Sequence, residues 1–138
     1  MAHTTVSLEI PATPERVWQL IGGFNSLPDW LPYIPSSVPS EGGRVRSLQT
    51  PGGEVIVERL EAFDQPGRSY TYSIVQAPFP VTGYQSTIKV GAGGTPASAL
   101  VTWSGSFIPL HVSDDEAVQL FHGIYTDGLA ALKQAFSC

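Results

Sequence analysis

Apolar and polar side chains alternate at the start of the chain and then recur with a helical spacing. Residues 3–10 alternate as a half-buried strand does. Thr13 can act as the N-cap of a helix, and Pro14 suits its first position, ahead of an apolar stripe that two glycines end. The pattern at 26–31 indicates a second short helix. The chain is therefore predicted to begin with one strand and two short helices.

The middle of the chain has strand-like segments separated by turn signals. Between residues 33 and 108, runs rich in β-branched and aromatic residues alternate with clusters of glycine and proline. This pattern predicts six more strands, joined in meander order. The turns are at Glu41-Gly42-Gly43, Pro51-Gly52-Gly53, Asp64-Gln65-Pro66-Gly67, Ala77-Pro78-Phe79-Pro80 and Gly91-Ala92-Gly93-Gly94.

One long amphipathic helix is predicted over 113–136. Ser113 can cap it, with Glu116 at the capping-box spacing. The apolar arc covers about half of the helix circumference, which is too wide for a helix on an ordinary surface, so the sheet must wrap around it. Small residues in this arc permit either close contact with the sheet or an open space beneath the helix: Ala117, Gly128, Ala131 and Ala135.

Composition and charge limit the partners. The 138 residues are expected to form a single domain, with 42% hydrophobic and 14% charged residues. The net charge of −5 is scattered and has no basic run, which disfavours nucleic acid and anionic membranes. No secretory signal or membrane-spanning segment is visible, so we expect a cytoplasmic protein. Cys138, the only cysteine, cannot form an intrachain disulfide.

Aromatic side chains gather on the inward faces of the predicted strands. Tyr72, Tyr84 and Trp103 are examples, and such a lining combines apolar area with hydroxyl and indole donors. It suits a pocket for a small hydrophobic or aromatic molecule, although each of these aromatics could instead fill the core.

A charge pair follows from strand register. If Thr50 lies opposite Glu54 in a hairpin, Arg46 lies opposite Glu58, because the numbers of paired residues have a constant sum. The two would share a largely apolar face. Glu58 could then act as an acid or base, and Arg46 could hold a carboxylate or an enolate. The alternatives are a purely structural pair, or an outward-facing pair if the register slips by one residue.

His111, in the loop before the long helix, is a further catalytic candidate beside Glu58 and Arg46. No two histidines have the spacing of helical metal ligands, and no nucleophile elbow, phosphate loop or dinucleotide motif is present, so neither metal nor cofactor is expected. The candidate ligand-binding residues are Trp30, Tyr33, Arg46, Glu58, Tyr72, Tyr84, Trp103, Phe107, Phe121 and Tyr125.

Six stretches distributed along the chain carry a resemblance to a known family. They lie at residues 10–18 (IPATPERVW), 27–32 (LPDWLP), 42–46 (GGRVR), 57–61 (VERLE), 70–74 (YTYSI) and 101–107 (VTWSGSF). Through them the chain resembles the SRPBCC superfamily of START-like and polyketide cyclase/dehydrase-like proteins. The resemblance implies an α+β helix-grip fold. In that fold a seven-stranded curved antiparallel sheet, two short helices after the first strand and a long C-terminal helix enclose a deep cavity, open near the second short helix.

Members of that superfamily bind lipids, polyketides, quinones, hormones or aromatic acids. Some catalyse cyclisation or dehydration with residues that differ between subfamilies, and some small members accompany methanol-oxidation systems. We therefore expect a monomer or homodimer that binds a small hydrophobic or aromatic molecule, such as a lipid, polyketide or aromatic acid. One alternative is a cyclase or dehydratase in which Glu58 or His111 moves a proton while Arg46, Tyr72 or Tyr84 stabilises an oxyanion. The other is a co-chaperone-like protein-interaction module.

Overall fold

The computed structural model describes residues 2–31 and 34–136, so the predictions for Tyr33 and Cys138 concern residues outside the described part. Within it the order of elements follows the predicted pattern. The elements are β1 (Ala2–Ile10), α1 (Pro14–Ile21), the 3₁₀ helix η1 (Leu27–Asp29), β2 (Ser36–Ser40), the 3₁₀ helix η2 (Glu41–Gly43), β3 (Val45–Gln49), β4 (Val55–Asp64), β5 (Ser69–Gln76), β6 (Val81–Ala92), β7 (Ala99–Pro109) and α2 (Asp114–Ala135).

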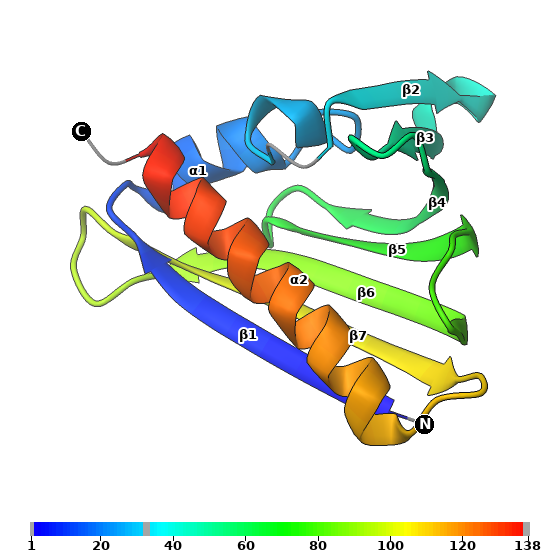
Figure 1. The fold of residues 1–138 in the computed structure, drawn as a ribbon. Helices are drawn as coiled ribbons and strands as arrows, with labels where there is room; N and C mark the ends of the chain where they lie inside the picture. Colours follow the sequence, from blue (N-terminus) through cyan, green and yellow to red (C-terminus); the bar gives the residue numbers. More distant parts are fainter. Residues whose placement is uncertain (1, 32–33, 137–138) are drawn as a thin grey trace.

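The seven strands form one antiparallel sheet in the order β1-β7-β6-β5-β4-β3-β2. Register shifts interrupt the ladder in β4 and β6, and such bulges bend strands and increase their twist. Figure 1 shows α2 lying across one face of the sheet, with its C-terminal end near α1. The predicted α+β helix-grip fold is confirmed.

Local signals at the helix starts are also confirmed. The hydroxyl of Ser113 accepts a hydrogen bond from the backbone N–H of Glu116 at 3.1 Å, and Thr13 caps α1 in the same way. The second predicted helix is shorter than expected, a single 3₁₀ turn. A proline at position 32 offers no N–H to continue the helix and disfavours helical geometry in the residue before it.

Close contact between α2 and the sheet depends on two glycines. A Cβ at Gly128 of α2 would lie 2.6 Å from Trp103 Cζ3 and 3.3 Å from Leu31 Cδ1. A Cβ at Gly105 of β7 would collide with the Tyr125 hydroxyl. Of the two alternatives for the small residues of the helix, close packing therefore holds at position 128.

We expect Gly128→Ala to destabilise the protein by ~1–2 kcal/mol in urea unfolding. Overpacking costs about 1–3 kcal/mol, which exceeds the gain of about 1 kcal/mol that alanine brings in a helix interior. Gly123→Ala on the same helix is the matched control, because nothing lies within 4 Å of the added methyl group. That variant should be stabilised by up to ~1 kcal/mol. Equal effects of the two substitutions would contradict close packing at Gly128.

Candidate ligand-binding site

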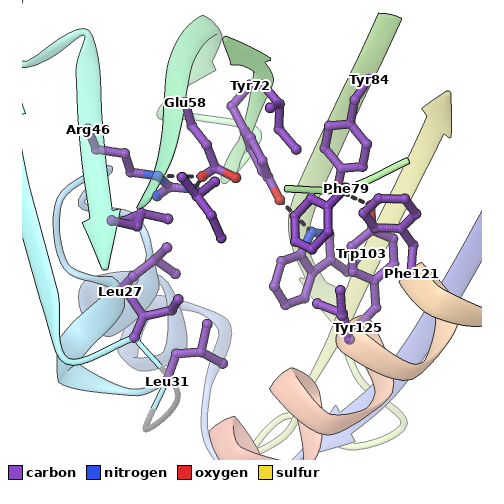
Figure 2. Close-up of a pocket in the computed structure, with 15 residues that line it drawn as sticks. Leu27, Leu31, Arg46, Glu58, Tyr72, Phe79, Tyr84, Trp103, Phe121 and Tyr125 are labelled. Carbon is purple, nitrogen blue, oxygen red and sulfur yellow. Dashed lines mark hydrogen bonds and ion pairs between the residues drawn. The ribbon is translucent and has the colours of Figure 1, made fainter. Parts of the chain in front are cut away.

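A cavity of about 70 Å³ lies between the sheet and α2. Figure 2 shows side chains from η1, the sheet and α2 converging on it. Most of its lining is aliphatic or aromatic carbon. The polar atoms come from six residues: Arg46, Glu58, Tyr72, Tyr84, Trp103 and Tyr125.

A cleft of about 300 Å³ adjoins this cavity. Its other walls include Thr50 and Pro51 of the β3–β4 hairpin. The cleft and the cavity share five apolar wall residues, so the cleft lies directly outside the cavity: Leu31, Ile34, Ile56, Phe79 and Ile124. An engineered cavity that holds benzene measures about 150 Å³, and ligand pockets start at about 300 Å³. A ligand larger than a few atoms that enters the cavity must therefore extend into the cleft.

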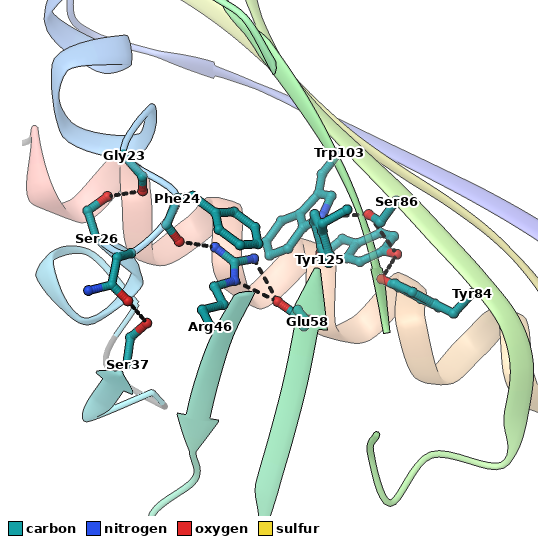
Figure 3. Close-up of polar contacts among 12 residues, drawn as sticks. Gly23, Phe24, Ser26, Ser37, Arg46, Glu58, Tyr84, Ser86, Trp103 and Tyr125 are labelled. Atoms are coloured by element: carbon teal, nitrogen blue, oxygen red, sulfur yellow. Dashed lines mark hydrogen bonds and ion pairs between the residues drawn. The ribbon is translucent and has the colours of Figure 1, made fainter. Parts of the chain in front are cut away.

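Arg46 and Glu58 form a buried ion pair at the inner end of the cavity. They are register partners in the β3–β4 ladder, as predicted. Arg46 Nε and one terminal nitrogen both contact Glu58 Oε1, at 2.8 and 2.7 Å, and the other terminal nitrogen donates to the Phe24 carbonyl at 2.5 Å (Figure 3). The pair lines the cavity, so the outward-facing alternative is wrong.

Aromatic rings cover the faces of the guanidinium group. Its central carbon lies 4.1 Å from the Phe24 ring centroid and 4.9 Å from that of Tyr72. The Arg46 side chain is 1% exposed, against 9% for Glu58. Cation–π contacts of this kind gain strength when the cation is desolvated.

Burial and pairing act in opposite directions on both charges. Burial lowers the pKa of Arg46, but the Glu58 carboxylate, with Tyr70 and Tyr72, raises that pKa by more, so the guanidinium stays charged. Burial raises the pKa of Glu58, and Arg46 opposes that rise. A buried guanidinium without a partner is costly, so the ionised carboxylate balances it. The pair adds no net charge to the cavity.

Hydroxyl groups form a second polar cluster near the pair. The hydroxyls of Tyr84 and Tyr125 are hydrogen-bonded, and Tyr125 donates to Ser86 Oγ at 3.3 Å. Ser86 in turn donates to a β7 carbonyl at 2.7 Å. Trp103 Nε1 is shared between Ser86 Oγ at 3.0 Å and the Tyr72 hydroxyl at 3.2 Å. Ser86 is therefore the centre of this network (Figure 3).

The tyrosines of this network remain neutral. Burial is the main cause that raises the pKa of Tyr72 and Tyr84 well above the ordinary value. Burial likewise raises the pKa of Tyr125 to about 12, although hydrogen bonds with Ser86 and Tyr84 oppose it. Each hydroxyl keeps its proton at neutral pH and can donate one hydrogen bond.

Most of the predicted ligand-binding residues converge on the cavity: Arg46, Glu58, Tyr72, Tyr84, Trp103, Phe121 and Tyr125. Phe107 is fully buried and packs against the rings of Tyr84 and Phe121. Trp30 is also buried, with its ring centroid 6.0 Å from that of Trp103. Both residues thus pack in the core and do not line the cavity.

His111 lies apart from the other catalytic candidates. It is exposed in the loop between β7 and α2, has a φ of 64°, and does not line the cavity. This position does not support the prediction that His111 moves a proton for a molecule in the cavity. The long β7 strand carries the chain away from the cavity before the loop begins.

The sequence did not identify several contributors to the site. Phe79 and Ile124 belong to the wall between cavity and cleft, and Ser86 connects the hydroxyl network. Phe79 had one signal, an aromatic side chain within a Pro-Phe-Pro turn, where polar residues are usual. The Phe24 carbonyl that holds Arg46 had none, because a backbone atom has no sequence signature.

In the described ranges 2–31 and 34–136, no three His, Cys, Asp or Glu side chains lie together as metal ligands would. None of the helices in this described part is both long and apolar enough to span a membrane.

The fold and the cavity define a helix-grip protein with a ligand-binding architecture. The sequence profile of the family described as "Polyketide cyclase / dehydrase and lipid transport" matches residues 1–137. The chain belongs to this family, within the SRPBCC and START-like proteins that its motifs indicated.

Solved structures share the fold. The protein XoxI from Bacillus cereus is 66% identical, with a TM-score of 0.97 over 99% of this chain and 96% of that one. An uncharacterised protein from Bacillus thuringiensis is 64% identical, with a TM-score of 0.97 over 98% of each chain. A START superfamily protein from Mycobacterium smegmatis, 16% identical, has a TM-score of 0.80 over 99% and 97% of the two chains. No curated protein sequence matches the chain.

We expect Arg46→Met to destabilise the protein by ~3–5 kcal/mol at pH 8, because it leaves a buried carboxylate without a partner. Loss of Arg46 raises the pKa of Glu58 further above its ordinary value. When the pKa of a carboxyl is higher in the folded protein than in the unfolded chain, the protonated carboxyl stabilises the folded state. This stabilisation is complete below the pKa of the unfolded chain and is lost as the pH rises through the pKa of the folded protein. Relative to the unchanged protein, the variant should therefore lose less stability at pH 5 than at pH 8.

The double variant Arg46→Met/Glu58→Leu is the control for that experiment. Replacing both charges with apolar groups is often neutral, so we expect it to recover most of the lost stability at pH 8. Denaturant unfolding at the two pH values measures all three proteins. A double variant as unstable as Arg46→Met would show that the loss comes from packing and not from the unpaired charge.

Proposed function

We propose that this protein binds one small, mainly apolar molecule whose polar end enters the cavity and whose apolar body lies in the adjoining cleft. The observation that carries the proposal is the arrangement of the two spaces. A small inner cavity with a charge pair and hydroxyls lies behind an apolar cleft of about 300 Å³, and the two share their walls. Concave, mostly apolar sites with a few convergent polar groups are the usual form of small-molecule sites.

The cost of the polar groups supports a binding role. Apolar side chains in place of a buried ion pair are often neutral or stabilising by about 1–4 kcal/mol. Arg46 and Glu58 are therefore poor choices if stability alone is needed at that position. The presence of open space beside them also favours a ligand-binding role over an interaction module, for which a filled interior would have been expected.

A thermal-shift and NMR titration screen tests the proposal with small alkylphenols, alkylbenzoates, alkylbenzenes and medium-chain fatty acids. At 100 times its dissociation constant a ligand should add ~2.7 kcal/mol of apparent stability. The expected result is a saturable shift with at least one class, accompanied by NMR changes at the shared wall. Absence of binding by every class would refute the proposal.

Ile124→Trp should block this binding. Ile124 belongs to the wall between cavity and cleft and is partly exposed, so a larger side chain can fill the opening without disturbing the fold. We expect the affinity for any ligand found in the screen to fall at least ~10-fold, or ~1.4 kcal/mol. Leu120→Trp, one turn earlier on α2 and 36% exposed, is the matched control and should bind like the unchanged protein. Equal losses in the two variants would contradict binding in the cleft.

A second candidate function is an enzyme of the cyclase or dehydratase type. The observation that favours it is Glu58, whose pKa burial raises and which lies in the cavity with neutral tyrosines nearby. Raised carboxyl pKa values are typical of general acids and bases. Glu58→Gln discriminates the two functions: an enzyme should lose turnover and its pH dependence while still binding substrate, whereas a binding protein shows no turnover in either form.

A further inference from the structure

The two oxygens of the Glu58 carboxylate are used differently. Both contacts from Arg46 go to Oε1. Oε2 has no hydrogen-bond partner among the described residues. Within that part of the chain, Trp30 Nε1 is the only side-chain polar atom that is both fully buried and without a partner, so Oε2 must be accessible. Glu58 lines the cavity, so Oε2 is presented to it as a hydrogen-bond acceptor.

Arg46, in contrast, is already engaged through each of its nitrogens. Each of its three nitrogens already has a partner in Glu58 or the Phe24 carbonyl, and two rings cover its faces. With the side chain 1% exposed, an incoming carboxylate would meet the Glu58 oxygen and not the guanidinium. The geometry does not support a role for Arg46 in holding an anionic group.

Tyr72 supplies a donor close to that acceptor. Its hydroxyl oxygen accepts from Trp103 Nε1. Ser86 also lies within hydrogen-bonding reach of the Tyr72 hydroxyl. The single Ser86 proton goes to a β7 carbonyl, and contacts from Trp103 and Tyr125 already use both acceptor positions of Ser86, so the Tyr72 proton has no free position there. No other acceptor for this proton is found among the described residues, so the proton can point into the cavity that Tyr72 lines.

Strand register places the donor and the acceptor together. Glu58 pairs with Ile74, and Tyr72 lies two residues from Ile74 on the same face of β5. Glu58 and Tyr72 are thus diagonal neighbours across the β4–β5 ladder, a separation of about 7–8 Å between Cα atoms. Figure 2 shows the Glu58 carboxyl between Arg46 and Tyr72. One small polar group can therefore meet both side chains.

We propose that the polar end of the ligand is a single uncharged hydroxyl group, phenolic or alcoholic, that donates to Glu58 Oε2 and accepts from the Tyr72 hydroxyl. A hydroxyl group is both donor and acceptor, which matches the pair, whereas a carboxylate has no proton to give and is repelled by Glu58. The space of about 70 Å³ admits this end, and the apolar body remains in the cleft. This assignment rests on the proposed function and specifies its ligand class.

Three probes of similar shape test the assignment: 4-propylphenol, propylbenzene and 4-propylbenzoate, titrated at pH 7.5 and followed by NMR and calorimetry. A hydrogen bond to a charged group should give 4-propylphenol at least ~10-fold higher affinity than propylbenzene. The benzoate should bind more weakly than the phenol by at least ~10-fold, since its charge faces Glu58. Equal affinities for phenol and propylbenzene, or tightest binding of the benzoate, would overturn the hydroxyl assignment and leave the proposed function standing. Binding of none of the three would count against both.

Tyr72→Phe isolates the donor. This variant should reduce the preference for 4-propylphenol over propylbenzene by ~3–10-fold while propylbenzene binds as before, because only the hydroxyl is removed. Thr71→Val is the matched control: it removes a hydroxyl from the opposite face of β5, where Thr71 contacts Thr87, and should leave the preference unchanged. A preference that survives Tyr72→Phe unchanged would overturn the role of Tyr72. The wild-type comparison of the three probes decides the hydroxyl assignment even if this variant fails to fold.

Discussion

The buried contact between Arg46 and Glu58 is the interaction on which the inner end of the site depends. Removing two charges from water costs several kcal/mol per ion, and only good geometry with additional hydrogen bonds offsets it. The structure supplies that geometry through the β3–β4 register, the Phe24 carbonyl and the rings over the guanidinium. The segment after α1, the β3–β4 hairpin and β5 are thereby fixed relative to one another.

The remaining interior is occupied mainly by aromatic side chains, and this limits the cavity. Tyr84, Phe107 and Phe121 pack with centroid separations of 4.7–6.1 Å, and Trp103 stacks on Tyr125 at 4.7 Å. The glycines at the contact between α2 and β7 allow this close approach. The deep cavity implied by the resemblance is consequently reduced to about 70 Å³, and most of the open space at this site lies in the adjoining cleft of about 300 Å³.

A narrow inner space with directed polar groups is more selective than a large apolar one. A large apolar cavity separates ligands by size and shape, with about 1–3 kcal/mol for each methylene group. A site whose buried donors and acceptors must be matched rejects molecules that leave them unpaired. Here most of the hydroxyl and indole hydrogens are already donated to partners within the protein. Few polar atoms of the lining therefore remain without a partner, and they lie close together.

The sequence by itself determined the order of elements and the caps at Thr13 and Ser113, which depend on local periodicity and on single residues. It predicted the pairing of Arg46 with Glu58 only for one hairpin register, and the structure selected that register. Only the tertiary structure decided which aromatic side chains line the cavity, why Phe107 packs in the core, and why His111 lies outside it. It also decided that both Arg46 contacts go to the same oxygen of Glu58, and that the third nitrogen of Arg46 is held by the Phe24 carbonyl. Those outcomes depend on distances between segments far apart in the chain and on how the interior volume is filled, and neither quantity is encoded in the spacing of residues along one strand or helix.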